Sequence, residues 1–288
     1  MTWALVVNPM ASRVSDESVA RVEAVLPHPV RTLRTVRPGE ATEIARELEG
    51  SVEAIVAFGG DGTFNEVLNG VRDQTPLGFV PGGGTSVLPR ALGLPREAEA
   101  AAARIAAGST RRISLGRVDG RRFGFNAGVG LDAELVRAVD LLGRAPDGRR
   151  PGDRAFAGAA ARLVLGRQGR FEPVLEVEGL GRAAFALVAN CSPYTYLGRL
   201  GLRVAREASF DCGLDLVAPV RLTPWSLPRF ALAAYRGAGD RGVRRAHDLD
   251  RLVVRCDVPL PLQVDGEDLG DVGGAVFEAE RNAVTVLV

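Results

Sequence analysis

Apolar and amphipathic segments alternate along the first third of the chain. Four short apolar runs are typical of strands buried on both faces, namely residues 3–9, 30–36, 52–58 and 77–81. Segments with helical character lie between and after them, at residues 15–26, 38–50, 64–71, 85–92 and 95–108. Strands that alternate with helices predict a parallel α/β sheet with helices on both faces.

From about Ile113 the pattern changes to short β-type runs, at residues 112–118, 121–128, 173–179, 182–190, 201–205, 213–220, 250–256 and 260–266. Helical segments interrupt these runs at residues 131–142, 152–166 and 224–237. We therefore expect an α/β domain over 1–112 and an antiparallel, β-sandwich-like domain with a few helices over 113–274. Segment 145–154 is expected to be a mobile loop. The last runs, 275–280 and 283–288, fit either domain.

Composition narrows the function classes. The chain has 288 residues, of which 46% are hydrophobic and 25% charged, as in a globular protein of about two domains. Its 36 basic and 35 acidic residues nearly cancel, which argues against a nucleic-acid partner. Every basic residue is arginine. The absence of lysine excludes a Walker P-loop, a protein-kinase strand lysine and a pyridoxal Schiff base.

The numbers and positions of the cysteines and histidines argue against disulfide-stabilised folds, zinc sites and histidine-based catalytic triads. The three cysteines, Cys191, Cys212 and Cys256, are far apart and odd in number, so neither a disulfide framework nor a CxxC metal site is expected. The two histidines, His28 and His247, do not suggest a catalytic triad or a zinc site. No basic segment precedes the first apolar run, and no uncharged apolar stretch reaches the roughly 18 residues that cross a bilayer. We expect a cytoplasmic protein.

The segment "VEAIVAFGGDGTFNEVLNG" carries the clearest chemical signal, because a strand-like run stops at Gly59-Gly60-Asp61-Gly62-Thr63 and a helix follows. Glycines allow close approach of the backbone to a ligand, and N–H groups at a helix start favour phosphate. Asp61 suits this site if a cation, most simply nucleotide-borne Mg²⁺, lies between the carboxylate and the phosphates. The alternative is a tight strand-to-helix turn with Asp61 as the helix cap.

A second glycine cluster follows the next strand in "PGGGTSVLPRALG", with the Thr85 and Ser86 hydroxyls at a helix start. The segment "VNPMAS" places Asn8 and Ser12 after the first strand. Carboxyl ends of parallel strands meet at one edge of a sheet, so these three loops are expected to border one crevice.

The ordered set "NPMAS", "TVRPGEA", "GGDGTFNEVLNG", "GFVPGGGTSVLPRALGLP", "FNAGVGLDAELV" and "LQVDGE" resembles the diacylglycerol kinase catalytic family, bacterial lipid kinases related to sphingosine kinases. The GGDGT block alone is shared with NAD kinases and phosphofructokinases. The resemblance implies an ATP-binding α/β domain over residues 1–112, to which a strand at about 275–288 returns, and a lipid-substrate domain over 113–274. It implies ATP and Mg²⁺ as cofactors and a lipid substrate met at a membrane surface. It leaves the oligomeric state open, a homodimer included.

The resemblance also assigns roles. The residues implied in nucleotide binding are Asn8, Pro9, Ser12, Thr35, Gly59, Gly60, Asp61, Gly62, Thr63, Asn65, Gly84, Thr85 and Ser86. Asp61 also holds Mg²⁺, through water or through the nucleotide. Glu267 of "VDGE" matches the family's general base, and Asp265 is expected to orient it. From the residues alone, "LPLQVDGEDLG" reads as a hairpin turn with solvated acids. Phosphoryl transfer to an alcohol still needs a proton acceptor, and a carboxylate must serve here.

Three positions depart from the family pattern. Val87 and Ser114 stand where the family pattern has acidic residues that extend a Mg²⁺ network, and Cys212 replaces an Asp in a turn that binds a structural Mg²⁺ in some relatives. At Cys212 we expect no structural Mg²⁺, with the turn held instead by an Asx-type bond of Asp211 and a positive φ at Gly213. Because of these departures, a degenerate ATP-binding regulator stays an alternative to the lipid kinase. A NAD-kinase-type enzyme with a soluble acceptor is the other.

Two further segments each allow two interpretations. In "CSPYTYLGRLGLRV", Tyr194, Tyr196 and Leu197 are suited either to an acyl chain or membrane interface or to packing within the second domain. In "PWSLPRFALAAYRG", apolar residues and arginines suit either an interfacial helix or a helix packed on the core, and the second is favoured.

Overall fold

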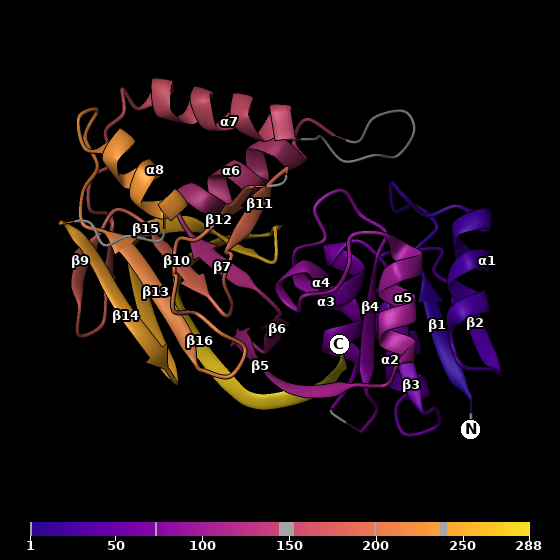
Figure 1. Cartoon of the computed structure of the whole chain (residues 1–288). Coiled ribbons are helices and arrows are strands. Elements are labelled where there is room, and N and C mark those ends of the chain that lie inside the picture. The colour runs from indigo at the N-terminus through magenta and orange to yellow at the C-terminus, as the bar shows by residue number, and fades with distance from the viewer. Residues whose placement is uncertain (1, 73, 144–152, 199, 237–240) are drawn as a thin grey trace. The chain divides into compact units, whose positions relative to one another are not determined.

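A computed structural model describes the chain except for residues 1, 73, 144–152, 199 and 237–240 (Figure 1). The chain divides into two compact units. The first unit comprises Met1–Ser114 and Arg281–Val288, and the second comprises Leu115–Glu280. The chain passes from one unit to the other within strand β5 (Thr110–Val118) and again within strand β16 (Glu267–Leu287).

The first unit contains a parallel sheet with strand order β2-β1-β3-β4, followed by the C-terminal end of β16. Its strands are β1 (Trp3–Val7), β2 (Val30–Arg34), β3 (Ala54–Gly59) and β4 (Leu77–Pro81). Its helices are α1 (Asp16–Val25), α2 (Glu40–Leu48), α3 (Asp61–Gly70), α4 (Val87–Ala91) and α5 (Ala98–Ala106). All residues of β1, β3 and β4 are buried, which is why these strands read as continuous apolar runs.

Local chemistry explains where α1 begins. Ser15 caps α1 by accepting a hydrogen bond from the Ser18 N–H at 3.2 Å, and the Ser18 hydroxyl accepts one from the Ser15 N–H at 2.9 Å. This reciprocal pair satisfies N–H groups that a helix start leaves without partners. Helix α1 packs against α5, and α2 packs against α3, so two helical layers cover the sheet. The predicted α/β class is confirmed for this unit.

The second unit is built on an antiparallel sheet with strand order β14-β13-β10-β7-β15-β16. Its strands besides β16 are β6 (Arg121–Phe123), β7 (Asn126–Val129), β8 (Leu175–Val177), β9 (Gly181–Ala183), β10 (Ala186–Ala189), β11 (Thr195–Leu197), β12 (Leu200–Leu202), β13 (Leu214–Pro219), β14 (Val243–Leu249) and β15 (Arg251–Val264). Its helices are α6 (Leu131–Asp140), α7 (Asp153–Gly166) and α8 (Leu227–Arg236). Figure 1 shows the three helices gathered at one side of this sheet.

Two apolar clusters form the core of the second unit. One lies around Phe123, Phe277 and the valines of β7, β10 and β15. The other lies around Phe171, Phe185 and Leu222, and side chains of α6, α7 and α8 pack against it. The predicted antiparallel β-rich class is confirmed here as well.

Several element predictions need correction. The runs at 250–256 and 260–266 belong to one strand, β15, because its pairing with β16 continues past an irregular register between Arg255 and Leu260. The runs at 275–280 and 283–288 likewise belong to β16 alone. Strand β14 was not predicted, because four of the seven residues in its sequence VRRAHDL are polar or charged and none of the seven is buried. The loop expected at 145–154 lies mostly outside the described residues.

Candidate active site

Two glycine loops lie in backbone contact at the carboxyl ends of β3 and β4. The Gly82 N–H donates to the Gly59 carbonyl at 2.6 Å. A Cβ atom added at Gly83 would lie 2.9 Å from the Gly60 Cα. Side chains at these points would push the loops apart, so the glycines are needed for the close approach. The structure thus brings together the two glycine clusters that the sequence predicted at one sheet edge.

The outer rim of these loops is open. A Cβ atom added at Gly62 or at Gly84 would meet nothing within 4 Å, and both glycines are exposed. Gly62 is the second residue of α3, and the cap residue Gly60 makes no side-chain bond to the helix start. N–H groups in the first turn of a helix have no intrahelical partners and carry partial positive charge. The rim therefore has room and donors for an anion such as phosphate.

Asp61 begins α3 and reaches the start of the next helix. Its Oδ1 accepts hydrogen bonds from the Val87 N–H at 2.7 Å and from the Leu88 N–H at 3.4 Å. Asp61 therefore ties α3 to α4 instead of capping its own helix. Among the described residues, no three His, Cys, Asp or Glu side chains gather as a metal site. Nucleotide-borne Mg²⁺ needs only one or two protein carboxylates beside phosphate and water, and a single Asp61 fits that requirement.

The loop after β1 joins the same edge. The Asn8 side-chain amide donates to the Thr63 Oγ1 at 2.9 Å, and the Asn8 N–H donates to the Phe58 carbonyl at 2.9 Å. Thr63 does not cap α3, because Gly60 occupies the cap position. The Thr35 N–H donates to the Val7 carbonyl at 2.9 Å, which places the end of β2 beside β1. Of the other predicted residues, Thr35, Thr63, Asn65 and Ser86 are buried, Ser12 and Thr85 are half-buried, and Pro9 is exposed.

Two details set the shape of this edge. Ser86 adopts a left-handed backbone with φ of 49°, and its hydroxyl donates to the Gly83 carbonyl at 3.3 Å. A serine in this conformation is strained, which is typical of ligand-binding turns. Asn65 points along its own helix, where its Oδ1 accepts from the Asn69 amide at 3.2 Å. Asn65 thus supports the helix in this structure.

In the second unit, Asp265 and Gly266 form the two-residue turn between β15 and β16. Both have positive φ, 47° and 78°, as a type I′ hairpin requires. Val264 pairs with Glu267 across the turn, so Glu267 is the first residue of β16. Its carboxylate forms an ion pair with Arg121. Its side chain is 53% exposed, and so the carboxylate remains accessible to an acceptor molecule.

Asp265 is buried and has a different environment from Glu267. Its Oδ2 accepts from the Gly124 N–H at 2.7 Å, and its Oδ1 accepts from the N–H groups of Phe125 at 3.0 Å and Asn126 at 3.1 Å. Three backbone donors stabilise the ionised form of a carboxylate. The interpretation from the residues alone, a hairpin with solvated acids, is wrong for Asp265, which instead binds the loop before β7.

A network of hydrogen bonds among polar side chains also holds this turn. The Gln263 Oε1 accepts from the Gly266 N–H at 2.9 Å, while its Nε2 donates to Asp132 at 2.6 Å and to the Asn126 Oδ1 at 3.0 Å. The Tyr194 hydroxyl donates to the Asp132 Oδ2 at 2.7 Å. Burial raises the pKa of Asp132, and the bonds from Tyr194 and Gln263 oppose that rise. Burial and the nearby Asp132 raise the pKa of Tyr194 well above its usual value.

Tyr194 therefore belongs to the interior of the second unit. Tyr194 is 3% exposed, and its hydroxyl belongs to the hydrogen-bond network around Asp132. The acyl-chain or membrane reading of Tyr194 is wrong, because the ring has no exposed face for such a contact. The alternative prediction for Tyr194, packing within the second domain, is confirmed.

The turn at Cys212 differs from our expectation at Gly213. Gly213 does not adopt a positive φ, so that part of the prediction is wrong. The Cys212 N–H donates to the Ser209 carbonyl at 3.0 Å, and the Gly213 N–H donates to the Asp248 Oδ1 at 2.7 Å. Asp211 donates its N–H to the Ser209 hydroxyl at 3.3 Å. Ser209 and Asp248 thus fix the turn from outside it.

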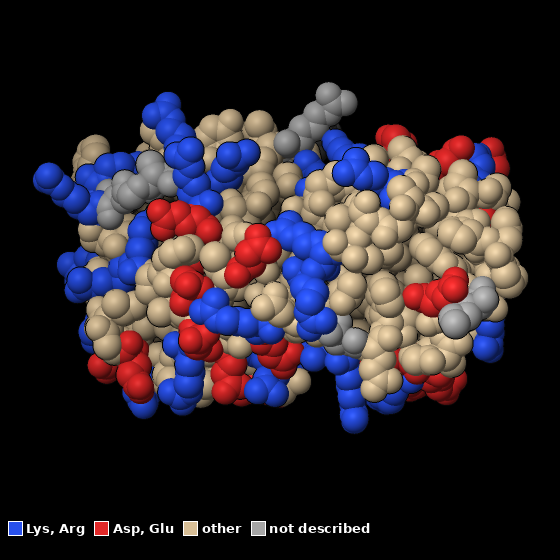
Figure 2. Space-filling view, turned by 60° about the horizontal axis from the view of Figure 1, so that its bottom comes forward, with Lys and Arg blue, Asp and Glu red and all other residues tan. Residues whose placement is uncertain are grey.

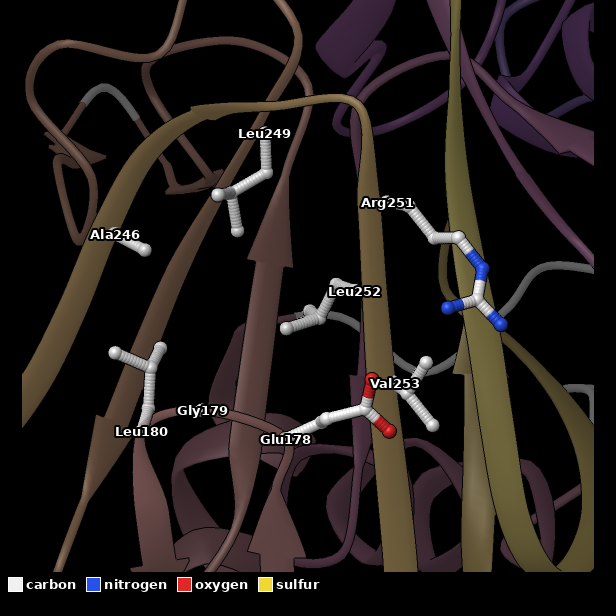
Figure 3. Close-up of a pocket in the computed structure, with 8 residues that line it drawn as sticks. All are labelled: Glu178, Gly179, Leu180, Ala246, Leu249, Arg251, Leu252 and Val253. Atoms are coloured by element: carbon white, nitrogen blue, oxygen red, sulfur yellow. The ribbon is translucent and has the colours of Figure 1, made fainter.

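A separate hollow lies on the second unit, lined by Glu178, Gly179, Leu180, Ala246, Leu249, Arg251, Leu252 and Val253 (Figure 3). It contains none of the predicted site residues. The charges on the molecular face in Figure 2 are mixed in sign, in keeping with the net charge of +1. The described helices include none with the length and apolar character needed to cross a membrane.

Comparisons with known proteins connect these features to a family. Residues 2–118 match the model of the diacylglycerol kinase catalytic domain. This part of the chain is similar to the catalytic domain of the diacylglycerol kinases. Over 113 residues the chain is 43% identical to a diacylglycerol kinase of Bacillus subtilis, covering 38% of this chain and 37% of that protein. It is 39% identical over 93 residues to a diacylglycerol kinase of Staphylococcus saprophyticus, covering 31% and 30%. The matches thus span about a third of these relatives.

Solved structures extend the likeness in fold to the whole chain. A diacylglycerol kinase from Bacillus anthracis superposes with a TM-score of 0.71 at 19% identity, over 99% of this chain and 96% of that one. An NAD kinase from Archaeoglobus fulgidus in complex with ATP superposes with a TM-score of 0.50 at 15% identity, over 99% and 93%. The fold of the second unit is therefore that of the diacylglycerol kinases as well, although the sequence match ends at residue 118.

Sequence reasoning missed partners that the fold brings together from distant positions. Arg121 pairs with Glu267, and Asp132 and Gln263 meet Tyr194. The separations of 62 to 146 positions leave no local spacing that could reveal these pairs. The predicted roles of the site residues stay predictions.

Proposed function

We propose that the protein is a lipid kinase that transfers the γ-phosphate of ATP to a hydroxyl group of a diacylglycerol-like lipid. The observation that carries the proposal is the open rim of the two touching glycine loops, within the segment that matches the diacylglycerol kinase catalytic domain. The ATP complex of the NAD kinase with a similar fold supports a nucleotide as the phosphate donor.

In this proposal, the glycine loops bind the ATP phosphates. N–H groups at the start of α3 and around Gly84 donate to phosphate oxygens, and Asn8 keeps the Thr63 side chain against the first loop. Asp61 would hold Mg²⁺ through water or through the nucleotide. The ion supplies charge neutralisation when bound. The bonds from Val87 and Leu88 fix the Asp61 carboxylate before any ligand arrives.

Glu267 is the proposed general base. The hydroxyl oxygen of the lipid attacks the γ-phosphorus, its proton passes to the Glu267 carboxylate, and the bond from the γ-phosphorus to the bridging oxygen breaks to release ADP. Asp265 acts as a positioning residue, since its three backbone bonds hold the turn that carries Glu267. Arg121 restrains the Glu267 side chain in the absence of substrate.

The test is a phosphorylation assay with the purified full chain, labelled ATP and Mg²⁺. Separate arms contain diacylglycerol in mixed micelles, a short-chain diacylglycerol in solution, NAD, or no acceptor. We expect phosphatidic acid in the lipid arms. Phosphorylated NAD in place of phosphatidic acid would identify a NAD-kinase-type activity. ATP binding without transfer in any arm would favour the degenerate regulator, and the proposal would then be wrong.

A further inference from the structure

Helix α8 has two faces of opposite character. Leu227, Phe230 and Ala233 face the core, where the Phe230 ring lies edge-on to Phe185 at a centroid distance of 5.9 Å. The outer face contains Arg229, Leu232 and Arg236 at helical spacing, with Tyr235 beside them, and Trp225 lies in the turn just before the helix. The exposed fractions are 92% for Trp225, 47% for Leu232 and 44% for Tyr235. The core-packed reading of this helix holds for one face only.

The C-terminal end of α7 lies directly beside the start of α8. A Cβ atom added at Gly169 would lie 3.2 Å from the Pro224 Cα, and the N–H groups of Phe171 and Leu222 donate to each other's carbonyls at 2.9 and 3.0 Å. Leu165 in the last turn of α7 is 75% exposed. The arginines on this end of α7 and after it, Arg162, Arg167 and Arg170, are also exposed. Figure 1 shows the two helices on the same side of the sheet.

We call the exposed side chains of these two segments the α7–α8 surface; they are Arg162, Leu165, Arg167, Arg170, Trp225, Arg229, Leu232, Tyr235 and Arg236. Its charge has one sign. The sequence contains no acidic residue between Arg154 and Phe171 or between Thr223 and Arg236. Glu134 binds Arg167 at 2.7 Å, and Glu172 pairs with Arg221 beside the surface. The charged side chains of the α7–α8 surface, which lie around its apolar side chains, are arginines.

We propose that the α7–α8 surface docks on a lipid bilayer that contains anionic lipids. A tryptophan that is almost fully exposed is unfavourable in water and is suited to the level of the headgroups, where tyrosine also partitions. Arginines around it match the negative potential of such a membrane. The choice of a bilayer over another partner rests on the proposed function, because a diacylglycerol-like substrate resides in a membrane. A second copy of the chain is the competing occupant.

Co-sedimentation with vesicles tests the proposal without nucleotide. Vesicles of phosphatidylcholine alone are compared with vesicles of phosphatidylcholine and phosphatidylglycerol. We expect binding to the anionic vesicles, weakened about tenfold by Trp225→Ala. The double variant Arg229→Gln/Arg236→Gln should weaken binding by about 25-fold, since each arginine near such a surface contributes about fivefold. Matched controls on exposed positions of the first unit are Val36→Ala and Arg31→Gln/Arg104→Gln, which should leave binding unchanged.

Tryptophan fluorescence locates the contact. The chain has two tryptophans, and Trp3 is buried in β1, so a Trp3→Phe variant reports Trp225 alone. Its emission should shift to the blue on vesicle addition and be quenched by brominated lipids. Bound protein with unchanged Trp225 emission would overturn the proposal. So would a change in sedimentation mass on Trp225→Ala without vesicles, which would identify a second copy as the occupant.

The outcomes separate this inference from the proposed kinase activity. Trp225→Ala should lose turnover on vesicle-borne lipid and keep turnover on a dispersed short-chain diacylglycerol. If the short-chain diacylglycerol is phosphorylated and the variants of the α7–α8 surface leave vesicle binding unchanged, the docking proposal alone is wrong. If no acceptor is phosphorylated, the kinase proposal fails whatever the vesicles show.

Discussion

Replacement of Gly62 by alanine should raise stability and lower nucleotide affinity at once. Gly62 lies in the first turn of α3 without a positive φ, and its added methyl group would touch no protein atom. Alanine is favoured over glycine in helices, by about 0.5 kcal/mol near a helix end. The melting temperature should therefore rise by about 1–2 °C. A ligand-free protein thus has no structural reason to keep glycine here.

The methyl group would occupy the space through which a phosphate approaches the N–H groups of α3. Loss of one hydrogen bond to a charged oxygen costs about 1.5–3 kcal/mol, so the Kd for ATP should rise about 10- to 150-fold. Gly62 is a better position for this test than Gly60, where a Cβ atom would already lie 3.7 Å from the Gly83 Cα. A larger side chain at Gly60 would disturb the second loop as well as the ligand.

Calorimetric titration with ATP and thermal unfolding of the same samples measure the two effects. Gly158→Ala in α7 is the matched control, because Gly158 is also helical and its added Cβ would also meet nothing within 4 Å. The control should gain stability and keep ATP affinity. If Gly62→Ala binds ATP within about twofold of the wild type, phosphate does not approach this rim and the assignment of the glycine loops is refuted.

Three further predictions concern charged side chains. Glu267→Gln should leave ATP affinity unchanged and lower the rate of lipid phosphorylation by about 10²–10⁴, and a fully active variant would place the base elsewhere. Asp61→Asn should weaken Mg²⁺-ATP more than metal-free ATP in titrations, and equal losses would remove its metal role. Hydrogen bonds from Arg137 hold the pKa of Asp268 below its usual value. This pair therefore stabilises the fold above pH about 4, and its contribution disappears as the pH falls through the lowered pKa of Asp268. Arg137→Gln should therefore lower the free energy of unfolding by about 1 kcal/mol at pH 7 and by progressively less below pH 4, as measured by urea denaturation; a deficit that is constant with pH would contradict this.

The first unit was predictable from sequence because its signals are local. Each buried strand reads as an apolar run, and Ser15 marks a helix start. The contact between the glycine loops also follows from local information, since parallel strands bring their carboxyl ends to one edge. What the pattern could not give is the partner of each side chain. Asp61 binds N–H groups 26 and 27 residues away, whereas the alternative interpretation of the sequence made it a cap of its own helix.

The second unit was less predictable because its contacts join distant segments. Strand β14 is largely polar, so it lacks the apolar signal of a strand. Two predicted strands merge into β15, because pairing with β16 tolerates an irregular stretch that the sequence presents as a break. Tyrosine is a residue type suited to interfaces, but Tyr194 is buried, because Asp132 and Gln263 form hydrogen bonds with its hydroxyl. Burial of a polar tip depends on partners that sequence spacing does not disclose.

The hairpin of Asp265 and Gly266 shows how the two kinds of information combine. The Asp-Gly pair alone predicts a tight turn, and the left-handed φ of both residues follows from that chemistry. An ordinary hairpin would leave its acids in water. Here the carboxylate of Asp265 is buried on three N–H groups, and Gln263 binds the next N–H of the turn, so the turn is fixed from two sides. Such rigidity is unnecessary for a connection between two strands. It suits the role that we propose for Glu267, the residue after the turn, because a general base must meet the reacting hydroxyl in a defined position.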